Sequence, residues 1–348
     1  MRALVTGGTG FIGSVLVERL LREGMQVTCV VRPGRHRRWL APLPVTCVSW
    51  DYQNISALAD AVAAADLVFH VAGVTRARNR SGYIYGNYRV TQSLLAACAA
   101  YGPPRQRLIF ISSLAAAGPS LEGHPRREEE EPTPVSHYGQ SKLLAEKAVL
   151  DFSRHRAATI IRPALVYGPR DRELLGYFKS IQWGVQPLPR RGVQGVSLVY
   201  VEDLVEGILL AVLSPQAPGR IYYLCDDEHY DWRQMGSLIA GVLQRSPVIL
   251  PVPPWLLRSI CLVAGGAAWL TGEAPYLNPD KYKEMSQVGW ICSNARARSE
   301  LGFAPATRLL AGLASTAAWY RRQGWLYPDS SVKPRFIGSK PDRRQQGV

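Results

Sequence analysis

The 348-residue sequence predicts an α/β fold, in which a doubly wound parallel sheet is followed by a smaller C-terminal domain. Three observations carry this prediction. Short apolar or β-branched runs alternate with helical segments through the first half of the chain, as in consecutive βαβ units. One of these runs, at 108–111, is apolar at every position, as expected for a strand that is buried on both faces. A glycine-rich turn at 6–13 connects the first strand to the first helix.

The expected strands are the runs at 3–5, 25–31, 45–48, 67–71, 108–111 and 158–161. Helices are expected between them at 11–21, 56–65, 88–101 and 136–155, and Gly102-Pro103-Pro104 ends the third of these. Because a helix follows almost every strand, neighbouring strands should run parallel, with helices on both faces of the sheet.

The same pattern predicts how the chain divides into domains. Residues 1–169 are expected to form a cofactor-binding domain, to which 197–224 return. Residues 170–196 and 225–327 are expected to form a smaller substrate-binding domain, and 328–348 a basic tail.

The composition is that of a globular protein, with 47% hydrophobic and 20% charged residues. The six cysteines contain no C-x-x-C pair, which argues against a zinc site and a disulfide framework. No metal site is therefore expected. Free cysteines are typical of a reducing compartment, so a cytoplasmic location is expected. The glycine-rich turn stands where a signal peptide would carry its apolar segment, so no signal peptide is expected.

The net charge of +14 comes largely from two clusters of basic residues, at 32–38 and 333–344. No recognised nucleic-acid-binding module interrupts the chain, so no nucleic-acid partner is expected. An anionic cofactor and an anionic membrane surface explain the cations better. A basic, solvated surface is the alternative, above all for the tail.

The glycine-rich turn predicts a dinucleotide-binding site. Gly7 can take the positive φ of a sharp turn, Gly10 lets a phosphate approach the backbone, and Gly13 lets the helix pack closely on the strand. The N-terminus of the following helix offers free N–H groups and the positive end of a dipole to a pyrophosphate. A turn with no ligand is the alternative for the glycines taken alone.

A second group of residues predicts proton transfer. Tyr138 and Lys142 lie four residues apart on an expected helix and therefore share a face. A phenol has a pKa of about 10, and a neighbouring ammonium favours its ionised form, so the pair suits general acid/base chemistry. Ser112 and Ser113 stand at the C-terminal end of the fifth strand, where open α/β sheets bind ligands. An ordinary amphipathic helix and a capped strand end are the alternatives.

These pieces resemble the extended short-chain dehydrogenases/reductases, the NAD(P)-dependent epimerase/dehydratase superfamily. The resemblance runs from residue 2 to about residue 327, and the motifs come in the order of the family. The matching motifs are T-G-x-x-G-x-x-G at 6–13, Asp51-Tyr52, H-x-A-[AG] at 70–73, Asn87 with Thr91, S-S-x-x-x-x-G at 112–118, Y-x-x-S-K at 138–142, R-P-x-x-V-Y-G-P at 162–169 and V-x-V-x-D-L at 199–204. Val90 stands where the family has a glycine.

The resemblance implies a Rossmann fold and a role for each matching residue. Tyr138 would be the general acid/base, Lys142 would hold the nicotinamide ribose and lower the pKa of the tyrosine, and Ser113 would bind the substrate oxygen. The implied cofactor contacts are the turn (Gly7, Thr9, Gly10, Phe11, Ile12, Gly13), the adenine side (Asp51, Tyr52), the end of the fourth strand (Val71, Ala72, Gly73), Asn87, Tyr138, Lys142, and, near the carboxamide, Pro163 and Val166.

The end of the second strand bears on the choice of cofactor. An NAD enzyme usually places an acid there, about 20 residues past the glycines. Here the segment reads Val30-Val31-Arg32-Pro33-Gly34-Arg35 and holds no carboxylate. Arg32 and Arg35 could pair with a 2′-phosphate, so NADP is favoured over NAD. Exposed arginines beside a bound NAD are the alternative.

The second half of the chain bears on the substrate. Residues 248–272 are strongly apolar, but the run between Arg258 and Glu273 is too short for a bilayer span of about 20 residues. A core helix, a lid over an apolar substrate and a helix in the membrane interface all remain open. Peripheral membrane contact through 248–272 and the basic tail, and a homodimer, are compatible with the sequence.

Within the superfamily the chain is most similar to the 3β-hydroxysteroid dehydrogenase and dihydroflavonol reductase-like branch. The similar residues are Val31-Arg32-Pro33, Pro253-Pro254-Trp255, Trp290, Leu301-Gly302-Phe303 with Pro305, and Trp319-Tyr320 with Gly324-Trp325. This branch implies hydride transfer between NAD(P) and a secondary alcohol or ketone of a sterol- or terpenoid-like small molecule. A nucleotide-sugar epimerase/dehydratase is the near alternative, for which Arg170, Arg172, Lys179, Arg190 and Arg191 could bind a diphosphate. A non-catalytic, NADP-sensing protein is the second alternative.

Overall fold

The structure, a computed structural model, describes residues 1–34, 36–189, 195–271, 275 and 277–327. Arg35, Arg190, Arg191 and the tail at 328–348, which the sequence singled out, lie outside the described residues.

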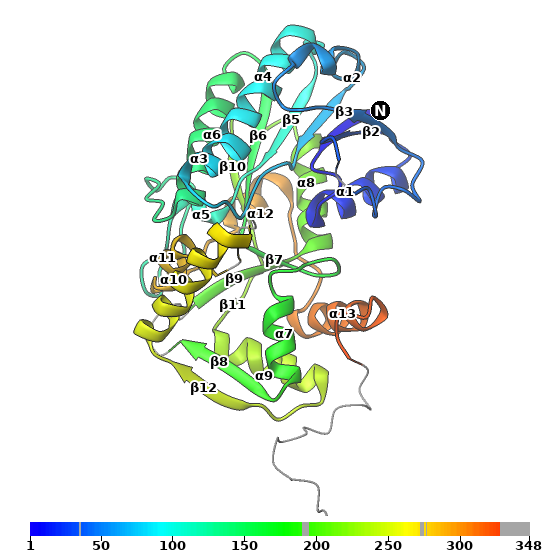
Figure 1. Cartoon of the computed structure of the whole chain (residues 1–348). Coiled ribbons are helices and arrows are strands. Elements are labelled where there is room, and N and C mark those ends of the chain that lie inside the picture. Colours follow the sequence, from blue (N-terminus) through cyan, green and yellow to red (C-terminus); the bar gives the residue numbers. More distant parts are fainter. Residues whose placement is uncertain (35, 190–194, 272–274, 276, 328–348) are drawn as a thin grey trace, which may run out of the picture.

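A seven-stranded, wholly parallel sheet forms the larger part of the molecule (Figure 1), in the order β10-β6-β5-β4-β1-β2-β3. Its strands are β1 (Arg2–Thr6), β2 (Gln26–Val31), β3 (Thr46–Ser49), β4 (Leu67–His70), β5 (Arg107–Ile111), β6 (Ala157–Pro163) and β10 (Ile221–Leu224). The prediction of a doubly wound Rossmann sheet is therefore confirmed, and β10 adds a seventh strand at one edge.

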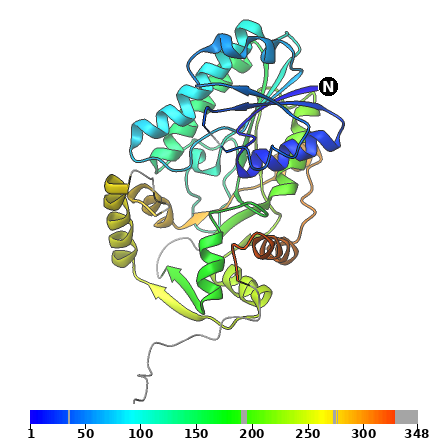
Figure 2. The same cartoon turned by 45° about the vertical axis from the view of Figure 1, so that its right-hand side comes forward.

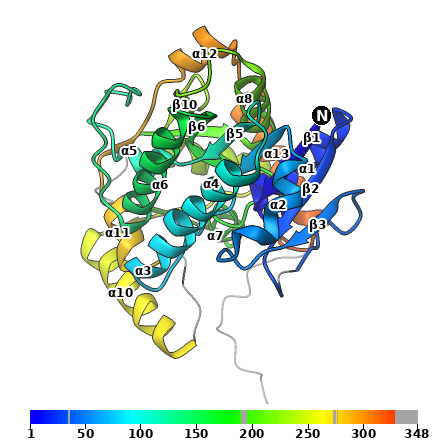
Figure 3. The same ribbon diagram turned by 90° about the horizontal axis from the view of Figure 1, so that it is seen from above.

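Helices cover both faces of this sheet (Figure 3), and each layer has its own apolar core. One layer contains α1 (Phe11–Arg22), α8 (Val201–Leu213) and α12 (Ala295–Leu301). The other contains η1 (Ile55–Leu58), α2 (Ala59–Ala63), α4 (Val90–Tyr101) and α6 (His137–Ser153). Because both faces are covered, β1, β4 and β5 are buried almost throughout, as their apolar sequences require.

The smaller part of the molecule lies below the C-terminal edge of the sheet (Figures 1 and 2). One small sheet joins β7 (Leu165–Tyr167), β9 (Gly195–Tyr200), β11 (His229–Tyr230) and β13 (Gly289–Trp290). A second sheet pairs β8 (Val185–Pro189) with β12 (Val248–Val252). Helices α7 (Leu175–Gln182), α9 (Trp232–Leu243) and α13 (Leu309–Arg322) pack together with β7 and β9 around a third core.

The helix expected at 88–101 begins earlier than the sequence pattern indicated. Asn79 caps α3 (Arg80–Tyr83) by accepting a hydrogen bond of 3.0 Å from the N–H of Gly82. A π-helical stretch, η2 (Ile84–Arg89), then leads into α4. The polar residues of this first part hid the helix, because they break the apolar period of 3.6 residues.

The acidic run at 128–131, which precedes the expected catalytic helix, covers the edge of the large sheet. Glu128 accepts a 3.0 Å hydrogen bond from the N–H of Tyr223 on β10, the outermost strand. Burial raises the pKa of Glu128 above its usual value, and this hydrogen bond opposes the shift. A carboxylate that occupies an edge N–H keeps the edge from pairing with another strand.

A buried ion pair fixes α6 on the sheet. Arg162 of β6 donates two hydrogen bonds to Glu146 of α6, of 2.9 Å and 2.7 Å, and both side chains are about 1% exposed. Ser112 donates a third hydrogen bond to the carboxylate at 2.5 Å. The remaining Arg162 nitrogen donates to the Tyr223 hydroxyl at 3.1 Å. The polar groups of this pair are therefore satisfied, as burial demands.

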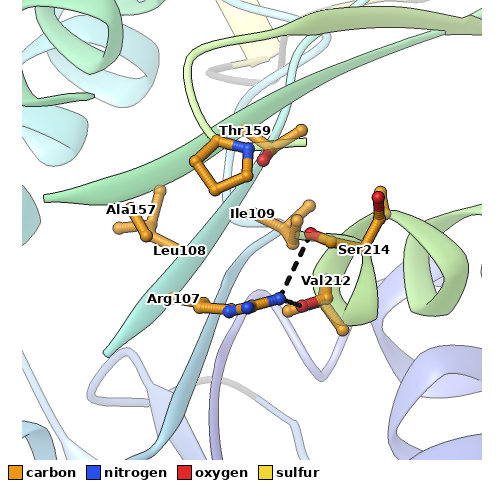
Figure 4. Close-up of a pocket in the computed structure, with 9 residues that line it drawn as sticks. Arg107, Leu108, Ile109, Ala157, Thr159, Val212 and Ser214 are labelled. Carbon is orange, nitrogen blue, oxygen red and sulfur yellow. Dashed lines mark hydrogen bonds between the residues drawn. The ribbon is translucent and has the colours of Figure 1, made fainter. Parts of the chain in front are cut away.

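At the opposite, N-terminal edge of the sheet, Arg107 closes the end of α8 (Figure 4). Its guanidinium donates to the carbonyl oxygens of Val212 at 2.9 Å and Ser214 at 3.2 Å. These oxygens have no partner within the helix, and a cation there also suits the helix dipole. This arrangement is structural, because it lies at the end of the strands that is remote from the glycine turn.

Within the described residues, no helix is long and apolar enough to cross a bilayer.

Removing one partner of the buried ion pair should destabilise the fold strongly. We expect Arg162→Leu to lower the free energy of unfolding by about 3–5 kcal/mol, because it leaves the Glu146 carboxylate buried without a counter-charge. The double variant Glu146→Leu/Arg162→Leu should lose less than the single one. Urea unfolding followed by circular dichroism measures both.

The control is Arg154→Leu, which breaks an exposed pair with Asp151 at the end of the same helix and should change stability by less than about 1 kcal/mol. A loss of that small size in Arg162→Leu would contradict the role given to the buried pair.

Candidate active site

The glycine turn has the conformation that the sequence predicts. Gly7 adopts φ +76°, and a Cβ there would stand 2.6 Å from the backbone nitrogen of Ala72. A Cβ at Gly13 would stand 2.2 Å from the carbonyl oxygen of Gly7. Neither position has room for a side chain, because the turn lies between the start of α1 and the end of β4.

The start of α1 fits an anionic group. Gly10, the N-cap residue, supplies no side chain, and the first turn of the helix holds no acidic residue. The first backbone N–H groups of the helix are therefore left for a ligand or water, at the positive end of the helix dipole. A dinucleotide pyrophosphate matches both features.

A chain of hydrogen bonds joins the end of β1, beside the glycine turn, to the end of β4 and the start of α4. The N–H of Ala72 donates to the Thr6 hydroxyl at 3.2 Å, and this hydroxyl lies 2.7 Å from Nδ1 of His70. Nε2 of His70 lies 2.8 Å from the Thr91 hydroxyl, which donates to the carbonyl oxygen of Asn87 at 2.5 Å. Because the Thr91 hydroxyl donates its proton to Asn87, it can only accept a hydrogen bond from His70. His70 therefore carries its proton on Nε2. Burial and the charge of Lys142 lower the pKa of His70 to about 3, so the ring is neutral.

Asn87 ties the end of β4 to α6. Its amide oxygen accepts from the N–H of Val74 at 2.8 Å, and its amide nitrogen donates to the carbonyl oxygen of Val74 and to the Ser141 hydroxyl. A Cβ on Gly73 would stand 2.9 Å from the Asn87 oxygen and 3.6 Å from Nζ of Lys142. The backbone at Gly73 therefore lies close to the side chains of Asn87 and Lys142, and a larger residue at position 73 would not fit.

Ser113, Tyr138 and Lys142 come together at the C-terminal end of β5. Ser113 is the N-cap of the short helix α5 (Leu114–Ala117), and its hydroxyl accepts a 3.1 Å hydrogen bond from the N–H of Ala115. The same hydroxyl lies close enough to Tyr138 to lower the pKa of the phenol. Lys142, one turn further along α6, donates to the carbonyl oxygen of Ile111 at 2.6 Å and lies 4.5 Å from the centre of the Phe110 ring. Ser113 stands at the start of α5, Tyr138 and Lys142 lie on α6, and these two helices pack against each other.

Burial dominates the protonation states of this group. It raises the pKa of Tyr138 well above the usual value, while the nearby Ser113 hydroxyl opposes the shift. Burial also lowers the pKa of Lys142 to about 8, against the attraction of the Glu146 carboxylate. In the cofactor-free protein Tyr138 is therefore a protonated phenol at neutral pH, and Lys142 titrates close to that range.

Helix α11 (Pro279–Met285), in the smaller part of the molecule, makes a contribution that sequence patterns did not predict. Asp280 accepts from the N–H groups of His137 and Tyr138, at 2.8 Å and 3.2 Å. Glu284 accepts a 2.7 Å hydrogen bond from the Ser136 hydroxyl, which caps α6. The first turn of α6 is therefore held by acids from a distant segment. Local patterns carry no record of such pairings.

The residues expected around the adenine lie along the same sheet edge. Arg32 follows β2 and is exposed, and Asp51 follows β3. Asp51 accepts from the N–H groups of Gln53 and Asn54, which lower the pKa of its carboxyl. Tyr52 takes φ +74° and packs edge-on against Trp50. Of the two residues expected near the nicotinamide, Pro163 ends β6 and Val166 lies in β7.

The lowered pKa of Lys142 predicts how stability depends on pH. An unfolded lysine titrates at 10.5 and the folded one at about 8. Between these values the unfolded chain binds more protons, so the free energy of unfolding should rise with pH. The gain should reach about 3 kcal/mol and should vanish in Lys142→Met. Urea unfolding of the cofactor-free protein at pH 7, 8, 9 and 10 measures it.

The matched control is Lys147→Met, an exposed lysine on the same helix, which should keep the rise. Parallel stability curves for Lys142→Met and the unaltered protein would show that the pKa of Lys142 is not lowered.

Comparisons with known proteins agree with this geometry. The sequence profile of the NAD dependent epimerase/dehydratase family matches residues 3–225, more than half of the chain. The chain is 29% identical to the ceramide reductase of Caulobacter vibrioides, over 92% of this chain and 95% of that protein. It is 27% identical to the 2-alkyl-3-oxoalkanoate reductase of Shewanella oneidensis, over 89% and 84%.

The human 3 beta-hydroxysteroid dehydrogenase type 7 is 26% identical, over 87% of this chain and 90% of that protein. Among solved structures, that of gox2253 superposes with a TM-score of 0.77 at 26% identity, over 93% of this chain and 99% of that one. The chain therefore belongs to the NAD dependent epimerase/dehydratase family of the extended short-chain dehydrogenases/reductases, and it is an NAD(P)-dependent oxidoreductase acting on CH–OH groups.

Proposed function

We propose that this protein moves a hydride between NADP(H) and a secondary alcohol or ketone of an apolar substrate, with Ser113, Tyr138 and Lys142 as its catalytic residues. The observation that carries the proposal is the meeting of Ser113, Tyr138 and the buried Lys142 at the C-terminal end of β5, where the Ser113 hydroxyl lies close enough to the phenol to lower its pKa. This arrangement presents two hydroxyl groups together at the sheet edge where α/β proteins bind their ligands.

Each of these residues has a distinct role in the proposed reaction. When bound, NADP(H) supplies or takes up the hydride. Ser113 orients the substrate oxygen, and Tyr138 gives its phenolic proton to that oxygen when a ketone is reduced. The raised pKa of Tyr138 favours this donor form. Lys142 lies on the same face of α6 and would hold the nicotinamide ribose and stabilise the phenolate that remains.

The segment after β2 supports NADP as the cofactor. Arg32 follows this strand directly, is exposed and makes no ion pair with any described residue. No carboxylate occupies this end of the strand to bind a 2′-hydroxyl. A guanidinium there suits the two charges of a 2′-phosphate.

The relatives support an apolar substrate. A ceramide, a 2-alkyl-3-oxoalkanoate and a 3 beta-hydroxysteroid, which their names specify, share an oxygen function on a long or fused hydrocarbon. Two of the five cations that could bind a nucleotide diphosphate are already engaged by other residues. Arg170 pairs with Glu18 and donates to Ser14, and Arg172 lies over the Trp325 ring. The reductase is therefore favoured over the nucleotide-sugar epimerase.

Assays with three substrate classes test this function. We expect NADPH oxidation, followed at 340 nm, with a long-chain 3-oxo compound or a 3-ketosteroid, and none with UDP-glucose. Tyr138→Phe should lower kcat by about 10²–10⁴-fold, because the proton donor is lost, while the affinity for NADPH stays the same.

Isomerisation of UDP-glucose without net cofactor oxidation would establish the epimerase instead. Unchanged turnover in Tyr138→Phe would refute the proton-transfer role. NADPH binding with no turnover of any of the three classes would favour the non-catalytic, NADP-sensing alternative.

Replacing Arg32 tests the choice of cofactor. We expect Arg32→Ala to raise the KM for NADPH by about 10–100-fold, since a charge-assisted hydrogen bond contributes about 1.5–3 kcal/mol. The KM for NADH should stay unchanged. The control is Arg105→Ala, which replaces an exposed arginine just before β5, at the N-terminal end of the strands. It should change neither KM. Equal changes for both cofactors would mean that Arg32 does not contact a 2′-phosphate.

A further inference from the structure

Helix α10 (Pro254–Thr271) and strand β12 present an extended apolar face, which we call the α10–β12 face. Val248 and Val263 are each 73% exposed, and Trp255 is 68% exposed. Its other exposed apolar residues are Ile249, Leu250, Leu256, Ile260 and Leu262. Eight large apolar side chains lie open on these two consecutive elements, and such a concentration of exposed apolar residues marks an interaction surface.

Nothing in the described part of the chain covers this face. Of the α10 side chains that the structure describes, only Leu257 and Cys261 are buried. The helix touches α11, where a Cβ on Gly265 would stand 2.8 Å from the Pro279 ring. Figures 2 and 3 show α10 standing away from the body of the molecule. The core-helix alternative for 248–272 is therefore wrong for residues 254–266, the part of α10 whose side chains are described.

The charges of this region select the occupant. Between Asp231 and Glu273 the sequence holds no acidic residue, and its only charged side chains are Arg233, Arg245 and Arg258. Arg258 projects from α10 itself and is exposed. An anionic surface would complement this face. A second copy of the chain, docked by the same face, would offer no acidic side chain from α10 or β12 to pair with Arg258.

The aromatic residues agree with a lipid surface. Trp255 opens α10, and Trp183, which precedes β8, is 64% exposed. Tryptophan prefers the level of the lipid headgroups, where its ring is buried and its N–H stays hydrated. A helix of 18 residues that carries an arginine in its second turn, and that cannot span a bilayer, can lie in the interface instead.

We propose that the α10–β12 face docks on an anionic lipid surface, with α10 lying in the headgroup region. The face is linked to the candidate active site through α11, because α10 packs on α11 and Asp280 of α11 accepts from the N–H of Tyr138. Docking of α10 would therefore bring the membrane close to α11, which contacts the first turn of α6. An apolar substrate could then reach the enzyme without crossing much water.

Vesicle flotation of the full-length protein tests this proposal. We expect it to float with vesicles of phosphatidylglycerol and phosphatidylcholine, more weakly with phosphatidylcholine alone, and to stay bound at 0.5 M salt. Trp255→Glu/Val263→Glu should lower binding by at least about tenfold, because charges replace two inserted apolar side chains. Arg258→Gln should weaken only the binding to anionic vesicles.

The matched control is Leu121→Glu/Leu310→Glu, two leucines that are 76% and 54% exposed on other surfaces, and it should bind like the unaltered protein. Circular dichroism and NADPH affinity establish that each variant is folded. Trp255→Phe gives an independent readout, since quenching of tryptophan fluorescence by a lipid-borne quencher should fall while binding persists.

Three outcomes would overturn the proposal. The first is the absence of vesicle binding. The second is binding that Trp255→Glu/Val263→Glu leaves unchanged, which would assign it to another part of the chain. The third is a dimer in the absence of lipid that the same substitutions dissolve, which would identify a second copy as the occupant. None of these depends on which substrate the enzyme reduces, so the lipid proposal and the proposed reductase function can fail separately.

Discussion

The position of α6 on the sheet is the constraint on which the rest of the site depends. Tyr138, Lys142 and Glu146 follow one another at intervals of four residues and therefore share one face of this helix. Glu146 is fixed to Arg162 of β6 by two buried hydrogen bonds. Because the helix is rigid, this contact also sets the depth and rotation of Lys142 and Tyr138 above the end of β5. A buried ion pair is a costly way to gain stability, but its geometry is exacting.

The first turn of the same helix is held from the other side by the smaller part of the molecule. Asp280 and Glu284 of α11 accept from the backbone of Tyr138 and from the Ser136 cap. Helix α6 is thus held between an ion pair in the sheet and two acids from the C-terminal segment. Because α10 packs on α11, a displacement of α10 would also affect α11, which accepts a hydrogen bond from the backbone of Tyr138.

The sequence predicted the large sheet well because its signals are local. A strand of continuous apolar residues and a glycine turn with positive φ at Gly7 are properties of neighbouring residues. The placement of Glu146 was open to the same reasoning, since it lies four residues after Lys142. The contacts of Glu128 with β10 and of Asp280 with α6 were not, because they join segments that are distant in the sequence. Hydropathy could not decide between a core and a surface position for α10, since both are apolar.

The protonation states bear on the direction of the proposed reaction. In the cofactor-free protein the Tyr138 pKa is raised, with burial as the largest cause. An oxidation would need the phenolate, which this environment disfavours, whereas a reduction needs the phenol that is present. Lys142, with its pKa lowered to about 8, is only weakly held in the charged form. A bound anionic cofactor would raise that pKa, because a nearby negative charge stabilises the ammonium. Cofactor binding and the charge that stabilises the spent phenolate would then be coupled through one buried lysine.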